Sequence, residues 1–187
     1  MKLLFFDIET TGLTPTKHSI HQISGCIEID GEEKECFNFN VAPNPKMEII
    51  DESLLISGKT REEVLNYRPM SIVFKEFINL LEKYVDKYDK NDKFFLVGYN
   101  NSAFDNQFLR QWFLQNNDRY FSSWFWQNPL DVYVLATQKF ICDRKNISDF
   151  KLKTVCKYAG IDVDEAKMHD AIYDIEITRK LYKIVTS

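Results

Sequence analysis

Asp7 and Glu9 are two carboxylates at the end of a strongly apolar segment, Leu3-Leu4-Phe5-Phe6. If residues 2–8 form a strand, as their hydrophobicity predicts, these two side chains project from one face, about 7 Å apart along the chain. A divalent cation between them would remove their mutual repulsion, and hard oxygen ligands suit Mg²⁺ or Mn²⁺. The alternative is a strand end at which both carboxylates face water. The pair therefore predicts a metal site only together with further carboxylates.

Two further carboxylates interrupt apolar helix faces. Asp174 falls within the inward stripe of a helix predicted over 165–185, and Asp105 precedes Phe108 in a helix predicted over 104–115. A carboxylate on a packed face is costly unless a partner or a metal ion neutralises it. His169 precedes Asp174 by five residues. A histidine near its neutral form could accept a proton there, and a surface histidine that caps the helix is the alternative.

Strands are predicted early in the chain and helices later. The strands are expected over 2–8, 20–30, 33–41 and 94–97, and the helices over 71–88, 104–115, 132–141, 149–159 and 165–185. Asp30-Gly31 favours a hairpin, so the first strands form an antiparallel meander. Ser71 and Asp131 are the expected N-caps of the helices that follow them. Because no repeat or linker interrupts this order, we predict one α/β domain over 1–187, with a mixed sheet flanked by helices.

The composition is that of a globular chain, with 187 residues, 44% hydrophobic and 28% charged. A net charge of −4 argues against binding nucleic acid through bulk positive charge. It leaves open an enzyme that meets a polyanion through metal ions held on carboxylates. The chain has no run long enough to cross a bilayer and no signal peptide pattern, which predicts a soluble, cytoplasmic protein without a membrane partner.

The cysteines lie far apart and form no C-x-x-C pair. A zinc site therefore has little support, and a chain without signs of export has little use for disulfide bonds. We expect free thiols at all of these positions: Cys26, Cys36, Cys142 and Cys156.

Three segments resemble, in order, the motifs of the DEDD exonuclease family. Phe6–Leu13 (F-D-I-E-T-T-G-L) is similar to the first motif, F-D-x-E-T-T-G-L. Gly98–Asp105 resembles the second motif, in which an Asn is followed shortly by Phe-Asp. His169–Asp174 (H-D-A-I-Y-D) resembles the third, H-x-A-x-x-D, whose histidine marks the DEDDh branch. That branch includes the proofreading subunit of bacterial polymerase III, ribonuclease T and oligoribonuclease. The likeness spans essentially the whole chain.

The resemblance implies a ribonuclease H-like fold with a mixed five-stranded sheet and a metal-dependent 3′–5′ exonuclease. Such an enzyme releases nucleoside 5′-monophosphates with two Mg²⁺ ions, for which Mn²⁺ substitutes. Carried over by position, Asp7 would contact both ions, Glu9 and Asp174 would complete the first site, and Asp105 would support the second. His169 would be the general base.

The same resemblance implies a set of substrate-binding residues. The backbone of Thr10, Thr11 and Gly12 would hold the terminal sugar, Leu13 would wedge against the last base, and Asn100 and Asn101 are candidates on the substrate side. A basic stretch could line the path of the strand, or form a solvated face: Lys139, Arg144, Lys145, Lys151, Lys153 and Lys157. The aromatic residues between 112 and 126 could include a stacking surface, although most such rings belong to a core.

The expected partner is the 3′ end of a single-stranded nucleic acid, with DNA favoured. An RNA-trimming enzyme of the ribonuclease T or oligoribonuclease type is the alternative, and a non-catalytic nucleic-acid-binding module is a third interpretation. Since the family includes dimers as well as polymerase-bound subunits, a homodimer and a polymerase or other replication partner both stay open.

Overall fold

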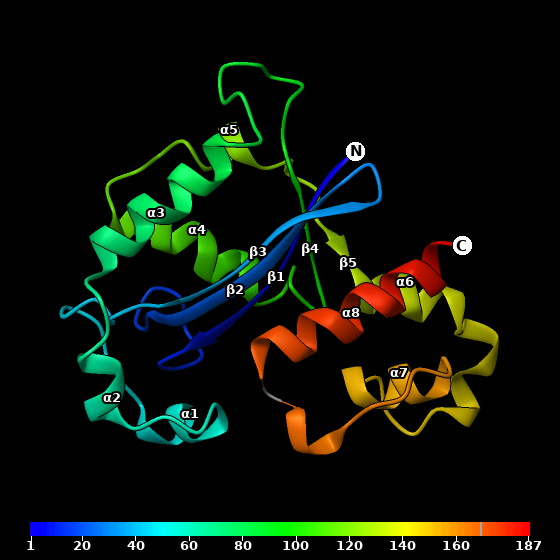
Figure 1. The fold of residues 1–187 in the computed structure, drawn as a ribbon. Helices are drawn as coiled ribbons and strands as arrows, with labels where there is room; N and C mark the ends of the chain where they lie inside the picture. The colour runs from blue at the N-terminus through cyan, green and yellow to red at the C-terminus, as the bar shows by residue number, and fades with distance from the viewer. Residues whose placement is uncertain (169) are drawn as a thin grey trace.

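A computed structural model describes residues 1–168 and 170–187, and a five-stranded mixed sheet runs through its centre (Figure 1). The strand order is β3-β2-β1-β4-β5. β1 pairs antiparallel with β2, and β2 antiparallel with β3, whereas β4 and β5 continue the sheet in parallel with β1. This confirms the predicted fold class. The bounds are β1 (Lys2–Thr10), β2 (Ile20–Ile29), β3 (Glu32–Asn40), β4 (Phe95–Gly98) and β5 (Leu130–Asp131).

Helices cover both faces of the sheet. Figure 1 shows α3 and α4 on one side and α6, α7 and α8 on the other. The short helices α1 and α2 follow β3, and α5 follows α4. The bounds are α1 (Asp51–Ile56), α2 (Arg61–Leu65), α3 (Met70–Glu82), α4 (Asp105–Gln115), α5 (Phe121–Trp124), α6 (Val132–Lys139), α7 (Leu152–Tyr158) and α8 (Ala171–Thr186), with 3₁₀ turns at Ile141–Asn146 and Glu165–Lys167.

The alternation of side chains along β1 divides the core in two. Leu4, Phe6 and Ile8 belong to the hydrophobic cluster under α3 and α4. Leu3 and Phe5 belong to the cluster under α6, α7 and α8. Because successive strand residues face opposite sides, Asp7 and Glu9 continue the row of Leu3 and Phe5. Both carboxylates therefore face the side of the sheet that α8 covers.

An ion pair fixes α8 on this face of the sheet. Arg179 of α8 lies 3.1 Å from the carboxylate of Glu28 on β2, and also pairs with Glu33 on β3. The side chains of Arg179 and Glu28 are only 16% and 6% exposed. Removal of one partner from such a pair leaves a buried charge without compensation. The pair therefore helps to hold Asp174, five residues earlier on the same helix, at its place beside the sheet.

Several element boundaries differ from the prediction. α3 ends at Glu82, because the chain then turns on hydrogen bonds such as that from the Asp86 N–H to the Asp92 carboxylate. Its N-cap is Pro69, so the assignment of Ser71 was wrong. α8 begins at Ala171, because Asp170 caps it by accepting a hydrogen bond from the Tyr173 N–H. α1, α2, α5 and β5 were not predicted; each has six residues or fewer, too short for a clear periodicity.

The expectation of free thiols is wrong for two of the cysteines. Cys26 and Cys36 form a disulfide bond between β2 and β3. They are partners in the register of the two strands, with Cα atoms 4.0 Å apart. Ten residues separate them in the sequence, so only the register of the hairpin brings them face to face. Cys142 is a free thiol on the surface, and Cys156 is a free thiol in the core.

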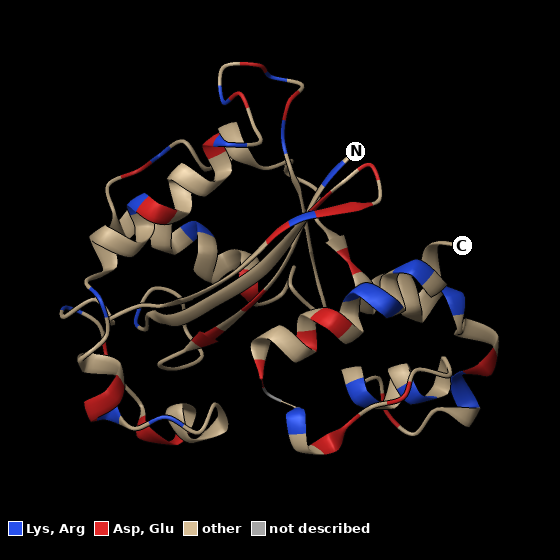
Figure 2. Cartoon of the chain, in the orientation of Figure 1, with Lys and Arg blue, Asp and Glu red and all other residues tan. Residues whose placement is uncertain are grey.

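Charged residues are spread unevenly over these elements (Figure 2). Acidic residues gather on the β2–β3 hairpin and near the end of β1, whereas α6, α7 and the later turns of α8 carry mostly basic ones. Within residues 1–168 and 170–187, no helix is long and apolar enough to cross a membrane.

Candidate active site

The ends of three elements bring together the four carboxylates singled out in the sequence. Asp7 and Glu9 lie near the end of β1, Asp105 is the first residue of α4, and Asp174 lies in the first turn of α8. Each of Asp105, Glu9 and Asp174 raises the pKa of Asp7, which requires that they lie within electrostatic reach of it. Asp7 and Asp174 also line one small cavity of about 170 Å³.

The parallel pairing of β4 with β1 places Asp105. Phe5 pairs with Val97, so β4 ends at Gly98 beside Phe6, and the chain turns back to begin α4. Gly98 is required at this point because a Cβ would lie 2.8 Å from Cβ of Asn101 and 3.1 Å from the carbonyl oxygen of Phe6. The Ile8 backbone lies close enough to the Asp105 carboxylate to lower its pKa. This proximity brings the second motif next to the first.

The carboxylates carry unusual pKa values. Burial, followed by the charges of Asp174 and Asp105, raises the pKa of Glu9 to about 7. Burial raises the pKa of Asp105 to about 7, although the nearby backbone of Asp105 itself and of Ile8 lowers it. Burial and the neighbouring acids raise the pKa of Asp7 well above its usual range. The gathering of these acids therefore costs free energy whenever they are ionised without a cation.

The donor set fits divalent cations. In the described part of the chain, no lysine or arginine forms an ion pair with Asp7, Glu9 or Asp105. Carboxylate oxygens are the ligands that Mg²⁺ and Mn²⁺ prefer. A bound cation would stabilise the ionised forms and offset the repulsion that raises these pKa values. The structure thus supplies both the ligands and the electrostatic need for a metal ion.

Glu9→Gln is expected to change how stability depends on pH. In the metal-free protein the pKa of Glu9 is about 7 when folded and 4.5 in its ordinary state. Its stabilising contribution is present below pH 4.5 and disappears as the pH rises to about 7, a change of no more than about 3 kcal/mol. The glutamine variant does not titrate there. Its free energy of unfolding should therefore rise relative to that of the wild type across this interval.

Urea unfolding in EDTA at a series of pH values measures this difference. Glu52→Gln, which alters an exposed glutamate on α1, is the matched control and should show a constant difference from the wild type. A constant difference for Glu9→Gln as well would contradict the burial and repulsion assigned to Glu9.

His169 lies outside the described residues, and its role as general base stays a prediction. The residues on either side of it are placed. Met168 lines the large cavity described below, and Asp170 caps α8. α8 begins at Ala171.

The candidate substrate-binding residues at the end of β1 and in the loop after it differ in how far they are exposed to solvent. Thr10, Thr11 and Gly12 are buried, whereas Leu13 is 73% exposed. The Thr10 hydroxyl donates to the Gly12 carbonyl oxygen. The Thr11 hydroxyl donates to the Glu48 carbonyl oxygen, and its backbone groups bond to Ser19 and Ile50. Thr11 thus holds the loop in place, and Leu13 is the residue of this set whose side chain is available to a ligand.

Asn100 and Asn101 also differ in exposure to solvent. Asn101 is fully buried, packs against Gly98 and donates from its side-chain amide to Asn106. Asn100 is exposed and lines the large cavity described below. Its φ of 61° is stabilised by Asp131, whose carboxylate accepts hydrogen bonds from the N–H groups of Asn100, Ser102 and Tyr133. Asp131 was predicted as the N-cap of a helix, which is confirmed, but its second role in holding this loop was missed.

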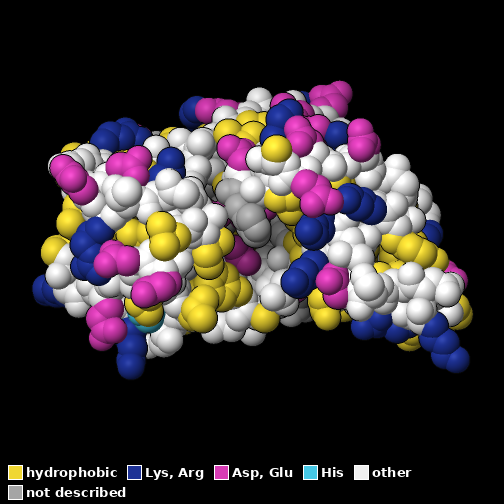
Figure 3. All heavy atoms as spheres, turned by 90° about the horizontal axis from the view of Figure 1, so that it is seen from below, with side chains coloured by type: hydrophobic (Ala, Val, Ile, Leu, Met, Phe, Trp, Pro, Cys, Tyr) yellow, Lys and Arg dark blue, Asp and Glu magenta, His cyan; other side chains and the backbone are white. Residues whose placement is uncertain are grey.

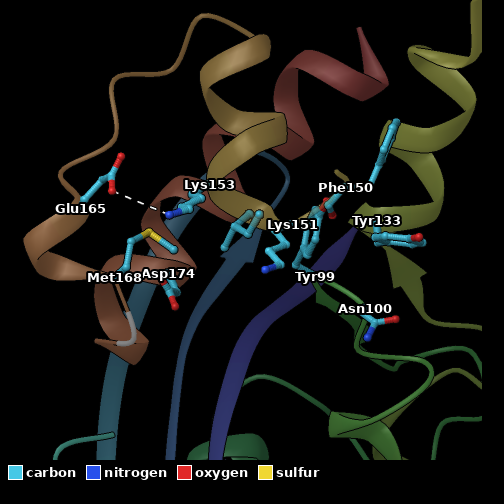
Figure 4. A pocket seen from close by; sticks show the side chains of 10 residues that line it. Tyr99, Asn100, Tyr133, Phe150, Lys151, Lys153, Glu165, Met168 and Asp174 are labelled. Carbon is cyan, nitrogen blue, oxygen red and sulfur yellow. Dashed lines mark hydrogen bonds and ion pairs between the residues drawn. The ribbon is translucent and has the colours of Figure 1, made fainter. Parts of the chain in front are cut away.

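A large cavity of about 810 Å³ opens beside Asp174 (Figure 4). Figure 4 shows aromatic side chains around it that come from the residue after β4, from α6 and from the segment before α7, together with Lys151 and Lys153 at the start of α7. Tyr99 and Tyr133 stand edge to face, with ring centroids 5.6 Å apart. Its lining residues are Tyr99, Asn100, Tyr133, Phe150, Lys151, Leu152, Lys153, Glu165, Met168 and Asp174.

Only part of the predicted basic stretch lies at this cavity. Lys151 and Lys153 line it, and Lys153 lies 3.7 Å from Glu165. Lys157 pairs with Glu165, Lys139 donates to the backbone of Ser187, and Arg144 donates to the backbone of Ile147. Figure 3 shows a hollow between the two halves of the molecule, with acidic side chains in it, basic ones on one wall and hydrophobic ones on the other.

Most of the aromatic residues between 112 and 126 belong to the core. The buried rings are Trp112, Phe113, Phe121, Trp124 and Phe125. The rings that line the large cavity, Tyr99, Tyr133 and Phe150, lie outside that stretch. Tertiary packing therefore removes five rings of this stretch from the surface, as expected for most of them, and brings other rings to the cavity.

Residues 4–182 match the model of the RNase T family, which is described as exonuclease. Because this match covers nearly the whole chain, the chain belongs to this exonuclease family, as the three motifs indicated.

Among curated proteins, the chain is similar to DNA polymerase III PolC-type of Thermotoga maritima, with 26% identity over 177 residues. The corresponding protein of Mycoplasmopsis pulmonis is 23% identical over 177 residues. The matches cover 94% and 95% of this chain but only 11% of each relative.

Among solved structures, the chain is similar to Exonuclease I of E. coli in complex with a dT13 oligonucleotide, with a TM-score of 0.77 and 21% identity. The zinc-bound form of the complex of the same enzyme with single-stranded DNA gives a TM-score of 0.79 and 23% identity. These matches cover 100% and 99% of this chain and 41% and 40% of the other. They show that the two proteins share the ribonuclease H-like exonuclease fold.

Proposed function

We propose that this protein is a metal-dependent 3′–5′ exonuclease that acts on single-stranded DNA. The observation that carries the proposal is the convergence of Asp7, Glu9, Asp105 and Asp174 at the ends of β1, α4 and α8. Carboxylates that repel each other this strongly are favoured at a site that binds cations. Membership of an exonuclease family supports hydrolysis of phosphodiester bonds as the reaction.

The chemistry assigns a role to each residue. Asp7, Glu9, Asp105 and Asp174 would hold two divalent ions. When bound, the ions make a water molecule more acidic and offset the negative charge that develops on the leaving oxygen. His169 would accept the proton of the attacking water. Arg179 keeps α8 and hence Asp174 in place.

The single-stranded nucleic acid would bind through residues that are exposed or that line the large cavity. Leu13 would pack against the last base, and Asn100 would donate hydrogen bonds at the 810 Å³ cavity. The rings of Tyr99, Tyr133 and Phe150 offer surfaces for bases. Lys151 and Lys153 offer positive charge for phosphates at the same cavity.

The comparisons favour DNA over RNA. The solved complexes contain oligodeoxynucleotides, and the curated relatives are DNA polymerase III chains. The same likeness favours a polymerase as protein partner. We extend the proposal to the whole chain as one exonuclease domain, since residues of β1, α4 and α8 contribute to one site.

Digestion of end-labelled oligonucleotides tests the proposal. Single-stranded DNA and RNA of matched sequence are incubated with Mg²⁺, with Mn²⁺ or with EDTA, each with a free and with a blocked 3′ end. We expect nucleoside 5′-monophosphates from free 3′ ends of DNA, and no cleavage in EDTA. Faster release from RNA would favour the RNA-trimming alternative. Cleavage that ignores the 3′ block would contradict an exonuclease, and no cleavage at all would favour the binding module.

A further inference from the structure

His18 lies beneath the loop that carries Leu13. Its imidazole is only 4% exposed. The ring atoms Cδ2, Cγ and Nε2 stand 2.2, 2.5 and 2.5 Å from the point that a Cβ on Gly12 would occupy. Since real Cβ atoms do not approach other atoms this closely, the ring excludes any side chain at position 12. Gly12 is therefore needed here because the imidazole packs directly on its backbone.

The same imidazole also closes the turn beyond Leu13. The Thr14 N–H donates to Nδ1 of His18 across 3.1 Å. The His18 N–H donates to the Thr14 carbonyl oxygen across 2.9 Å. His18 thus contacts the chain on both sides of Leu13, at Gly12 and at Thr14.

The backbone around this ring is anchored to a third segment. The backbones of His18 and Glu48 form an isolated parallel β-bridge. The Thr11 hydroxyl donates to the Glu48 carbonyl oxygen across 2.8 Å. The Ser19 N–H donates to the Thr11 hydroxyl across 3.0 Å. These backbone contacts hold residues 11, 18 and 19 against Glu48. The His18 ring lies between this anchored backbone and Gly12.

We infer that His18 is a positioning residue that sets the orientation of Leu13 and so determines how tightly the 3′-terminal base is held. A side chain that is already oriented needs no ordering when the strand binds, which improves affinity without changing the chemical step. The inference rests on the proposed function, because it assumes that Leu13 contacts a base. His18 itself is buried and touches no substrate.

Steady-state kinetics on a single-stranded DNA oligonucleotide test this role. For His18→Ala, the KM should rise roughly tenfold, the order expected when one side chain must be ordered on binding, while kcat changes less than twofold. His18→Asn keeps an acceptor for the Thr14 N–H but loses the ring. It should show the same rise in KM with a smaller loss of thermal stability. A wild-type KM in both variants, or a fall in kcat with KM unchanged, would overturn the inference.

A double-mutant cycle with Gly12→Ala makes the test specific for the contact between the ring and the glycine. In the wild-type background Gly12→Ala should raise KM, because the new methyl group displaces the imidazole. In the His18→Asn background the same change should not raise KM further, because the imidazole ring is absent. An equal effect of Gly12→Ala in both backgrounds would show that this contact does not set KM.

His21→Ala is the control for lost stability. His21 is also fully buried, but its contact is with Ser57 rather than with the loop. It should lower thermal stability and leave KM within twofold of the wild type. A tenfold rise in KM for His21→Ala would show that KM follows stability alone, against a specific role for His18. If the wild-type protein releases no mononucleotides, the proposed function is contradicted. If the enzyme is active but KM does not change in the His18 variants, only the role of His18 is contradicted.

Discussion

Asp7→Asn is expected to reduce the release of mononucleotides by roughly 10³-fold or more, equivalent to about 4 kcal/mol of transition-state stabilisation. Asp7 is the carboxylate whose pKa is raised by all three of its acidic neighbours, so it lies at the centre of the cluster. Asparagine preserves the shape of the side chain but removes one negative charge from the proposed cation ligands. The enzyme should therefore lose its affinity for metal ions together with its activity.

The same substitution should stabilise the metal-free protein. Burial and repulsion raise the pKa of Asp7, so the ionised carboxylate opposes folding at neutral pH, whereas a neutral amide does not. In thermal unfolding at pH 7.5 with EDTA, we expect a higher Tm for Asp7→Asn than for the wild type. With Mg²⁺ the order should reverse, because the cation stabilises only the wild type.

Asp89→Asn is the matched control for this pair of measurements. Asp89 is exposed, and its carboxylate accepts a hydrogen bond from the Asn91 N–H, which an asparagine can preserve. Activity and Tm should stay at their wild-type values. If Asp7→Asn kept its activity, the carboxylate cluster would not be the catalytic site, and the binding-module interpretation would regain support.

His169→Ala is expected to slow turnover by roughly 10²–10⁴-fold, the range found when a general base is removed. In contrast to Asp7→Asn, stabilisation by Mg²⁺ should persist, because the proposed metal ligands are intact. The measurements are kcat with a DNA oligonucleotide and the shift in Tm on addition of Mg²⁺. Loss of that shift would assign His169 as a metal ligand, and unchanged turnover would exclude it as the base.

A pH profile separates these roles further. If an imidazole accepts the proton, wild-type kcat should fall below about pH 6.5 as the ring becomes protonated. The residual activity of His169→Ala should lack this fall. A profile that is the same in both proteins would point to another group as the acceptor.

Local patterns predicted the central elements well. The apolar run ending in Asp7 and Glu9 predicted β1, and the Asp30-Gly31 dipeptide predicted the hairpin that joins β2 to β3. These features depend on neighbouring residues, which is why periodicity and turn preference suffice to identify them. The disulfide bond between Cys26 and Cys36 escaped prediction because it depends on how two strands align, not on either strand alone.

The candidate site shows the same division between local and long-range information. The four carboxylates could be named in advance because each interrupts an apolar pattern or stands in a motif. Their raised pKa values could not be predicted, since burial and repulsion exist only after residues 7, 105 and 174 have come together. Likewise, only the fold shows that Thr11 and Asn101 are buried while Leu13 and Asn100 reach the surface.

The amino-acid sequence by itself determined the family, the order of the longer elements and the identity of the acidic residues, because these follow from residue type and spacing along the chain. The tertiary structure decided which side chains of each motif face a ligand and how strongly the acids affect one another. It also placed His18 against Gly12, a contact that no sequence motif predicted. These properties depend on distances between segments that are remote in sequence, and packing of the two cores against the sheet determines those distances.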